Sequence, residues 1–339
     1  MKVGINGLGR IGRAIFRNNL NKKYFKITQI NDINPDNKNL AYQLKYDSTY
    51  GTLANSVEGH KDFILIDEKD DVSVFHHKDI HKVPWDVDVV IDSSGIHSNV
   101  VNARKIKHIK RYVVTHSPES KLVDKSVIIG VNEKTVKDDD KIISSSICDA
   151  CAFAPTVNLL NKNYGVDNGF ITTLHPWLNY QNLLDGQSVS FAYPGTTHGR
   201  YELGRSSINA LIPKPTSCVT ATEQALPWIK DKFLSFSFRV PTMTVSSADI
   251  SVKLKNKTTR RDIVSLFMKM EAMQKFNIFH NSSEPLISKD FEKMEYSAVV
   301  DHRWTSLNDS NYLKLILWYD NEWGYSSLVL DLIKYLEKQ

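Results

Sequence analysis

The chain has 339 residues, of which 41% are apolar and 24% charged, and its formal net charge is +5. This length predicts two domains with a core each, and the composition excludes disordered, collagen-like and disulfide-stapled chains. No apolar run approaches the roughly 18 residues of a membrane span, and the glycine-rich start does not fit a signal peptide. We therefore expect a cytoplasmic protein that binds no membrane. Because no reading motif accompanies the mild positive charge, we expect no nucleic acid partner.

The first elements in chain order form a dinucleotide-binding pattern. A strand over residues 2–6 leads into a glycine-rich turn and a helix over 10–19, and a second strand over 26–31 ends at Asp32. This is the strand, glycine turn, helix, strand and carboxylate order of the Rossmann fingerprint. The residues expected to bind the cofactor in this turn are Gly7, Gly9 and Gly12.

Each part of this pattern has a physical task. Gly7 allows the tight turn, Gly9 a close approach to a pyrophosphate, and Gly12 the packing of the helix on the sheet, while the helix N-terminus attracts the phosphates. Asp32 accepts hydrogen bonds from ribose hydroxyls and would repel a 2′-phosphate. The sequence therefore favours NAD as the cofactor over NADP. Ser94 ends a later strand at the same edge, where ligands bind in such sheets.

The remaining expected elements divide the chain into two styles. Strands that alternate with helical stretches predict a mostly parallel sheet, at residues 63–66, 87–91, 112–115, 126–129 and 141–144. From about residue 170, long alternating runs predict a mostly antiparallel sheet, at residues 235–240, 248–255 and 313–319. A final amphipathic helix is expected over 326–337. The fold class is therefore α/β, with a Rossmann-type domain followed by an α+β catalytic domain.

A reactive cysteine is expected where the two styles meet. Of the three cysteines, Cys148 directly precedes an apolar helical run over 152–160, and the dipole of a helix N-terminus favours a thiolate. His175, at the end of a strand-like segment, is the candidate base. The spacing alone does not bring these two residues together. Cys151 completes a C-x-x-C pair without a second pair nearby, so we expect no metal. It is either a packing thiol or the partner of a redox switch, and Cys218 a packing thiol.

Along nearly its whole length the sequence resembles the phosphorylating glyceraldehyde-3-phosphate dehydrogenase family. The matching segments are Val3–Arg13, Ile30–Asp32, Tyr46–Gly51, Gly130–Asn132, Thr172–His175, Phe238–Thr242 and Tyr319–Ser326. The resemblance implies an NAD-binding domain over residues 1–147, completed by a helix over 325–339, and a catalytic domain over 148–324. It also implies a homotetramer.

The resemblance assigns roles to individual residues. Cys148 would attack an aldehyde to give a thiohemiacetal, and His175 would activate the thiol and then assist hydride transfer to NAD, leaving a thioester. Asn321 would hold the nicotinamide carboxamide, and Tyr325 stands in the same cofactor motif. Arg10 and Ile11 would lie against the pyrophosphate and adenosine region of the cofactor. Inorganic phosphate would then release the product as an acyl phosphate.

Departures from the family pattern cluster at its phosphate subsites. Hydroxyls or small polar groups are lost or replaced at Ile147, Asp149, Leu178, Tyr180, Pro215 and Ser217. Thr216 and Arg239 still fit an anion site, and with Asp149 they form the candidate substrate residues. The segment 185–205 is about nine residues longer than the family norm. It is interpreted either as surface drift or, as we expect, as an ordered loop that reshapes the substrate pocket.

These departures lead to one main reading and two alternatives. The main reading is an NAD-dependent aldehyde dehydrogenase of this family with an altered substrate, whose thioester is resolved by water or another acceptor. The first alternative is the ordinary glycolytic glyceraldehyde-3-phosphate dehydrogenase. The second is a paralogue without catalysis that works as a binding or regulatory protein. The sequence identifies neither the aldehyde nor the direction of flux.

Overall fold

The computed structural model describes residues 1–197, 199–309 and 311–338. The chain folds into two compact units. The first comprises residues 1–126, 135–145 and 329–339, and the second comprises residues 127–134 and 146–328. Relative to the expected domains, the segment 127–134 belongs to the second unit. Within that unit Gly130 packs against Ile278.

The first unit is built on a nine-stranded sheet in the order β3-β4-β5-β2-β1-β6-β7-β9-β8. All neighbouring strands are parallel except in the β3-β4-β5 edge, which is antiparallel. The strands are β1 (Lys2–Asn6), β2 (Lys26–Asn31), β3 (Val57–Gly59), β4 (Phe63–Ile66), β5 (Asp70–Phe75), β6 (Val89–Asp92), β7 (Arg111–Val114), β8 (Lys125–Ser126) and β9 (Ile142–Ser144).

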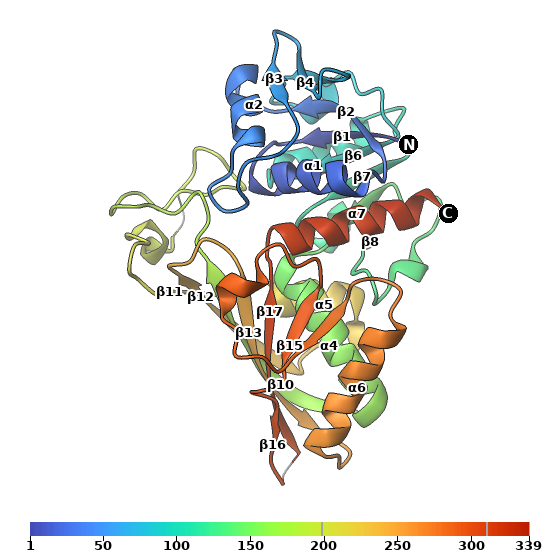
Figure 1. Ribbon diagram of the computed structural model, residues 1–339, viewed down its shortest axis with the longest axis vertical. Helices are drawn as coiled ribbons and strands as arrows, with labels where there is room; N and C mark the ends of the chain where they lie inside the picture. Colours follow the sequence, from blue (N-terminus) through green and yellow to red (C-terminus); the bar gives the residue numbers. More distant parts are fainter. Residues whose placement is uncertain (198, 310, 339) are drawn as a thin grey trace. The chain divides into compact units, whose positions relative to one another are not determined.

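The helices of this unit connect its strands (Figure 1). They are α1 (Arg10–Lys22), α2 (Asn37–Lys45) and α3 (His97–Asn102), and the unit also includes the end of α7 (Trp323–Glu337). From β1 the chain first adds strands on the β2 side of the sheet and then crosses to the opposite side of β1, where β6 lies. This reversal creates a crevice at the carboxyl ends of β1 and β6, the usual place for a ligand in such sheets.

The second unit is built on an eight-stranded sheet in the order β11-β12-β10-β13-β17-β15-β14, with β16 beside β17. Four of its strand pairs besides β16–β17 are antiparallel, and β10–β12 and β14–β15 are parallel. The strands are β10 (Val166–Pro176), β11 (Ile212–Lys214), β12 (Phe233–Val240), β13 (Ser246–Leu254), β14 (Phe279–Ser282), β15 (Ala298–Asp301), β16 (Ser306–Leu307) and β17 (Tyr312–Tyr319).

Its helices are α4 (Cys148–Tyr164), α5 (Cys218–Ala225) and α6 (Arg260–Met273), together with the start of α7. Helix α4, green in Figure 1, is buried almost throughout and contacts β10, β13, β15, β17 and α5. It contains Pro155, which removes the hydrogen bond that the Cys151 carbonyl would otherwise accept. The Ser297 hydroxyl donates to that carbonyl instead, so the helix continues unbroken and its first turn stays fixed.

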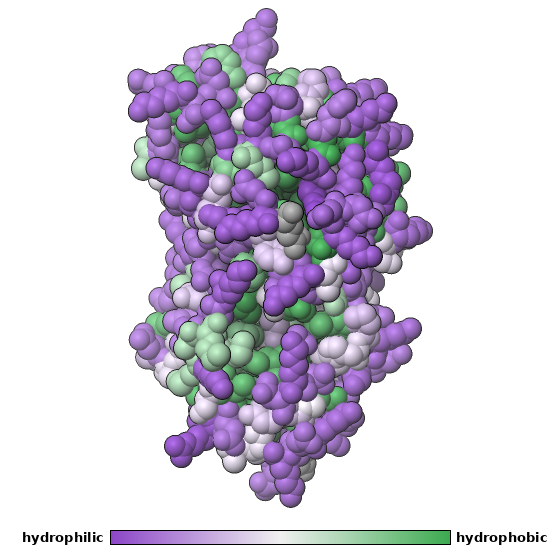
Figure 2. Space-filling model, turned by 90° about the vertical axis from the view of Figure 1, so that its right-hand side faces the viewer, coloured by the Kyte–Doolittle hydropathy of each residue, from purple (hydrophilic) through white to green (hydrophobic). Residues whose placement is uncertain are grey.

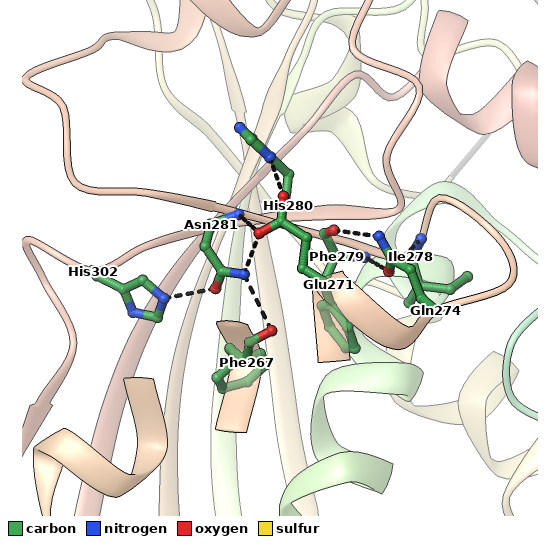
Figure 3. A network of polar contacts seen from close by, with 8 residues as sticks. All are labelled: Phe267, Glu271, Gln274, Ile278, Phe279, His280, Asn281 and His302. Atoms are coloured by element: carbon green, nitrogen blue, oxygen red, sulfur yellow. Dashed lines mark hydrogen bonds and ion pairs between the residues drawn. The ribbon is translucent and has the colours of Figure 1, made fainter. Parts of the chain in front are cut away.

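A polar network ties α6 to β14 (Figure 3). The Glu271 carboxylate accepts from the Asn281 side-chain amide at 2.6 Å and contacts Nδ1 of His280 at 2.6 Å. His302, which is 2% exposed, donates from Nε2 to the Asn281 side-chain oxygen at 2.7 Å, and its Nδ1 lies 3.1 Å from the Thr305 hydroxyl. Burial, followed by the charge of Arg260, lowers the pKa of His302, which favours the neutral ring.

Short 3-10 helices complete the described structure, at Ile80–Lys82, Ala103–Lys105, Ser120–Leu122, Glu133–Thr135, Tyr201–Gly204, Pro227–Ile229 and Ser288–Phe291. Within the described residues, no helix has the length and apolar character needed to cross a membrane. On the face in Figure 2 most side chains are hydrophilic, with smaller apolar patches between them.

One expected strand is wrong. The apolar run 126–129 is mostly not a strand, because β8 ends at Ser126. The backbone N–H of Ile128 is satisfied by the side chain of Asn132 at 2.8 Å. The apolar residues of this run are buried although they pair with no strand, and an apolar run of this length looks like a buried strand in the sequence.

Candidate active site

The register of the second sheet gathers polar side chains on one face. His175 on β10 is opposite Arg239 on β12, and two residues earlier Thr173 is opposite Ser237. Ser237 in turn is opposite Lys214 on β11. Because side chains alternate along a strand, all five point to the same face. The sequence could not reveal this grouping, because it depends on the pairing of three strands.

Helix α4 begins over this face with Cys148 as its first residue. Ser146, two residues before Cys148, adopts a left-handed φ of 62°, which turns the chain toward the helix. The carbonyl of Ser146 accepts a hydrogen bond from the Tyr325 hydroxyl at 3.0 Å. Tyr325, predicted from the cofactor motif, thus holds the backbone two residues before the cysteine.

The Cys148 sulfur and the His175 Nε2 lie 3.7 Å apart. Nδ1 of His175 is 2.7 Å from the carbonyl of Pro176, to which only a protonated nitrogen can donate. The other nitrogen of a neutral ring then carries a lone pair toward the thiol. The structure therefore brings together the two residues that spacing alone did not connect, in the arrangement of a nucleophile and its base.

The protonation states differ from the sequence-based expectation of a helix-stabilised thiolate. Burial, followed by the neighbouring Asp149 carboxylate, holds the pKa of Cys148 well above its ordinary value of 9.0. Burial and the positive charge of Arg239 lower the pKa of His175 to about 4. Near neutral pH the resting pair is therefore a thiol and a neutral imidazole, and the thiol needs His175 in order to react.

Asp149 lies buried beside the sulfur, with only 5% of its surface exposed. One carboxylate oxygen is 3.6 Å from the Cys148 sulfur and accepts from the Tyr319 hydroxyl at 2.7 Å. The other accepts from the Thr216 hydroxyl at 3.2 Å. Burial alone would raise the pKa of Asp149, but His175, Tyr319 and Arg239 outweigh it and lower the pKa. Asp149 is therefore an anion at neutral pH.

Two cations face this carboxylate. Arg239 is 6% exposed and donates to the Tyr180 hydroxyl at 3.4 Å, and its Nε has no hydrogen-bond partner among the described residues. Burial and Arg239 lower the pKa of Lys214 to about 8, so Lys214 is charged at neutral pH. With Asp149 the cluster has a net charge of about +1. A buried guanidinium with an unpaired donor suits an incoming anion.

The predicted substrate residues Asp149, Thr216 and Arg239 thus lie around one cysteine. Sequence reasoning missed Lys214 and Tyr319. A lysine two residues before Thr216, in the same segment, was the available signal for Lys214. Tyr319 stands in a recognised motif, but nothing in the sequence pairs its hydroxyl with Asp149.

The three side chains Cys148, Asp149 and His175 also offer ligand atoms within 4.8 Å of one another, a spacing that could hold a metal ion. The expectation of no metal stays a prediction. Cys151 is 3% exposed within α4, and burial raises its pKa to about 12, which favours a packing thiol. Cys218 is fully buried.

The first unit has the features expected of a dinucleotide site. Gly7 has a φ of 87°, and an added Cβ there would lie 2.8 Å from the backbone of Ser94. At Gly12 a Cβ would meet the Gly7 carbonyl, whereas at Gly9 it would meet nothing within 4 Å. Gly9 thus opens α1 onto free space, as a pyrophosphate requires.

Asp32 and Ser94 lie at the carboxyl ends of β2 and β6. The Asp32 carboxylate accepts from the backbone of Leu8 at 2.7 Å, which links it to the glycine turn. The Ser94 hydroxyl donates to the buried Asp92 at 2.6 Å. Arg10 is an ion-pair partner of Asp47 beside the Tyr50 ring. The glycine turn, Asp32 and Ser94 therefore lie at the ligand-binding edge of the sheet, and Arg10 and Ile11 open α1 directly after the turn. Their roles in cofactor binding stay predictions.

In the second unit, Asn321 provides the test of fit for a nicotinamide. It is 4% exposed, and its side-chain oxygen is buried without a hydrogen-bond partner among the described residues. An unpaired buried acceptor is costly unless a ligand supplies a donor, and a carboxamide N–H₂ is such a donor. The residues present therefore fit NAD.

Residues 185–197 and 199–205 of the long segment contact one another, and residue 198 lies outside the described residues. The backbone N–H of Gly186 donates to the Gly204 carbonyl at 2.9 Å, and Asp185 pairs with Arg205 at 2.9 Å. Phe191 in this loop packs on Tyr180, with ring centroids 6.1 Å apart. Tyr180 contacts Arg239, so the loop reaches the residues around the site. That the loop reshapes the substrate pocket stays a prediction.

Comparisons with known proteins agree with this fold and site. Residues 1–100 match the family model "Glyceraldehyde 3-phosphate dehydrogenase, NAD binding domain", and residues 147–321 match the corresponding C-terminal domain. A glyceraldehyde-3-phosphate dehydrogenase of Ogataea parapolymorpha is 34% identical, over 99% of this chain and 98% of the relative. That of Borreliella burgdorferi is 32% identical over the full length of both. A cytosolic one of Gracilaria gracilis is 33% identical over 99% and 98%.

The fold and the site define an oxidoreductase that acts on an aldehyde with NAD. The chain belongs to the glyceraldehyde-3-phosphate dehydrogenase family. The relatives' names favour the ordinary substrate, which the sequence analysis kept as an alternative, over the altered substrate that it preferred.

Proposed function

We propose that this protein oxidises glyceraldehyde 3-phosphate, or a closely similar anionic aldehyde, through a covalent thioester on Cys148. The observation that carries the proposal is the contact between the Cys148 sulfur and a neutral His175 beside the cations Lys214 and Arg239. The names of the relatives support the choice of aldehyde.

The chemistry follows from the protonation states. His175 accepts the Cys148 proton at Nε2 as the sulfur bonds to the aldehyde carbon, and this proton passes to the aldehyde oxygen to give a thiohemiacetal. In the first unit the glycine turn and Asp32 would hold NAD, which would accept the hydride, and in the second unit the Asn321 side-chain oxygen suits a carboxamide donor. As the carbon loses its hydride, Nε2 takes the hydroxyl proton, and a thioester to Cys148 remains.

The anionic group of the substrate is assigned to Arg239 and Lys214. Arg239 has a buried donor without a partner among the described residues, and Lys214 lies close enough to Arg239 for that positive charge to lower its pKa. Their charges replace the hydroxyls that the resemblance leads one to expect near Leu178 and Pro215. A charged donor binds an anion more strongly than a neutral hydroxyl does.

The test is NADH formation by the full-length protein with glyceraldehyde 3-phosphate and with glyceraldehyde. We expect glyceraldehyde 3-phosphate to give a kcat/KM at least about 100-fold higher than glyceraldehyde, because only the phosphorylated aldehyde can contact both Arg239 and Lys214. Lys214→Met should remove much of this preference, and Lys230→Met, an exposed lysine of the same unit, should not. No NADH with either aldehyde would contradict the proposal.

A second candidate is an altered aldehyde, favoured by the apolar Leu178 and by the contact of the long loop with Tyr180. It predicts that another aldehyde outperforms glyceraldehyde 3-phosphate in a panel with NAD. A preference for glyceraldehyde 3-phosphate throughout that panel would exclude it.

We also propose a homotetramer in the cytoplasm. The outer face of the second sheet exposes large apolar side chains at Phe170 (55%), Leu234 (68%) and Phe236 (38%), more than an isolated subunit usually leaves in water. The relatives from Gracilaria gracilis and Chondrus crispus are named cytosolic. Light scattering coupled to size-exclusion chromatography should give four times the chain mass of 38.6 kDa, and a monomer would contradict the proposed assembly.

A further inference from the structure

The Asp149 carboxylate occupies the space beside the nucleophile. It is one residue after Cys148, its nearer oxygen is 3.6 Å from the sulfur, and it is 5% exposed. An acyl group on that sulfur would therefore have a fixed negative charge as its immediate neighbour.

The same carboxylate already uses the neutral donors around it. The Tyr319 hydroxyl donates to one oxygen at 2.7 Å, and the Thr216 hydroxyl donates to the other at 3.2 Å. The Thr173 hydroxyl lies 3.5 Å from the second oxygen, and its proton has a closer acceptor in the Ser237 hydroxyl at 2.8 Å. An anion arriving at this side of the thioester would find these protons taken and a negative charge in its place.

We infer that Asp149 excludes inorganic phosphate as the acyl acceptor, so that water releases the product as a carboxylic acid. This inference rests on the proposed function, because it concerns the thioester which that function forms. Asp149 is thus a residue that determines which acceptor reacts. Like charges repel strongly in a site of low dielectric, whereas neutral water is not repelled.

The cations do not restore a phosphate site for the acceptor. Arg239 on β12 and Lys214 on β11 lie on the same face of the sheet as Ser237 and Thr173. If they hold the anionic group of the substrate itself, their charge is not available to offset Asp149 for a second anion. Arg200, a further cation in this region, acts on Lys214 and helps to lower its pKa. The ordinary reaction must accommodate two anions, the anionic group of the substrate and inorganic phosphate. Here the Asp149 carboxylate takes the place of the second.

The release step balances with groups already in the site. His175, neutral at physiological pH because its pKa is about 4, accepts a proton from water at Nε2. The hydroxide oxygen bonds to the thioester carbon, the carbon–sulfur bond breaks, and the sulfur takes the proton back from His175. The acid then ionises and releases one proton to solvent, so no further reactant is needed.

The experiment measures both halves of the reaction. Rapid mixing of the full-length protein with NAD and glyceraldehyde 3-phosphate records the first turnover of NADH. Steady-state rates are then compared with and without inorganic phosphate, and the product is identified by mass spectrometry. We expect a first turnover, a steady-state rate that phosphate changes less than about twofold, and a carboxylic acid product.

The variant Asp149→Asn removes the charge and keeps the shape. We expect phosphate to stimulate its steady-state rate at least about tenfold, as a ratio of rates within the same variant. Asp167→Asn, an exposed aspartate of the same unit, should show the wild-type ratio.

The outcomes separate the inference from the function beneath it. Absence of a first turnover would overturn the proposed function. A normal first turnover followed by phosphate-dependent turnover to an acyl phosphate would overturn this inference alone. So would a thioester that neither water nor phosphate releases. The wild-type measurement decides the matter even if Asp149→Asn does not fold.

Discussion

Replacement of His175 by glutamine tests the assignment of the base. In the structure the Cys148 thiol is protonated at rest, because burial and Asp149 raise its pKa above 9.0. A thiol with a pKa of 9.0 is only about 1% thiolate at pH 7, and Cys148 has less. Without its base, Cys148 can attack only through this small fraction. We therefore expect His175→Gln to slow the first turnover of NADH by about 10²- to 10⁴-fold at pH 7.

The same variant has a distinctive pH dependence. Wild-type acylation should change little between pH 7 and 9, because His175, with a pKa of about 4, is neutral throughout this range. In His175→Gln the rate should rise about tenfold per pH unit, following the thiolate. Rapid-mixing absorbance of NADH measures both, and the exposed His60→Gln is the control. A loss smaller than tenfold at pH 7, or a flat profile in the variant, would refute the reasoning.

Three further predictions concern the anion site, the cofactor turn and stability. Lys214 has a pKa of about 8 and is positive below it, so KM for an anionic aldehyde should rise as pH increases through 8, and Lys214→Met should abolish that rise; a pH-independent wild-type KM would contradict this. Gly12→Ala should lower the free energy of unfolding by about 1–3 kcal/mol, because the added Cβ meets the Gly7 carbonyl. Gly9→Ala should unfold like the wild type but bind NAD more weakly, because its Cβ meets no protein atom within 4 Å. Calorimetry of unfolding and of NAD binding checks this contrast. Burial and Arg260 lower the pKa of His302 below 6.5, so below that pH the unfolded chain binds more protons than the folded one. The free energy of unfolding should therefore fall on acidification, by up to about 1.4 kcal/mol per pH unit. His302→Gln should reduce this slope in urea titrations at several pH values, and an unchanged slope would argue against the assignment.

Local patterns in the sequence predicted the first unit well. The glycine turn, α1 and Asp32 follow one another within a few residues, so short-range geometry fixes them. Helix α6 was missed, although Thr259 and Asp262 form a capping box at its start. The signal was present in the sequence and was not used.

The catalytic pair marks the limit of local reasoning. The segment before α4 and the strand that ends in His175 were recognisable, but their contact came from the resemblance and not from spacing. Lys214 could not be placed beside Arg239 because this depends on the pairing of β11 with β12. The expectation of a thiolate was wrong because it considered only the helix dipole. In the folded site, burial and the negative charge of Asp149 both raise the pKa of Cys148.

The most direct test of the account is the mass of the protein after a single turnover. Full-length protein would be mixed with NAD and glyceraldehyde 3-phosphate, quenched in acid and analysed by peptide mass spectrometry. The account predicts an acyl group of the oxidised aldehyde on the peptide that contains Cys148, formed with one equivalent of NADH and absent in Cys148→Ser. NADH production without any adduct on Cys148, or with an adduct on Cys151 or Cys218 instead, would contradict it.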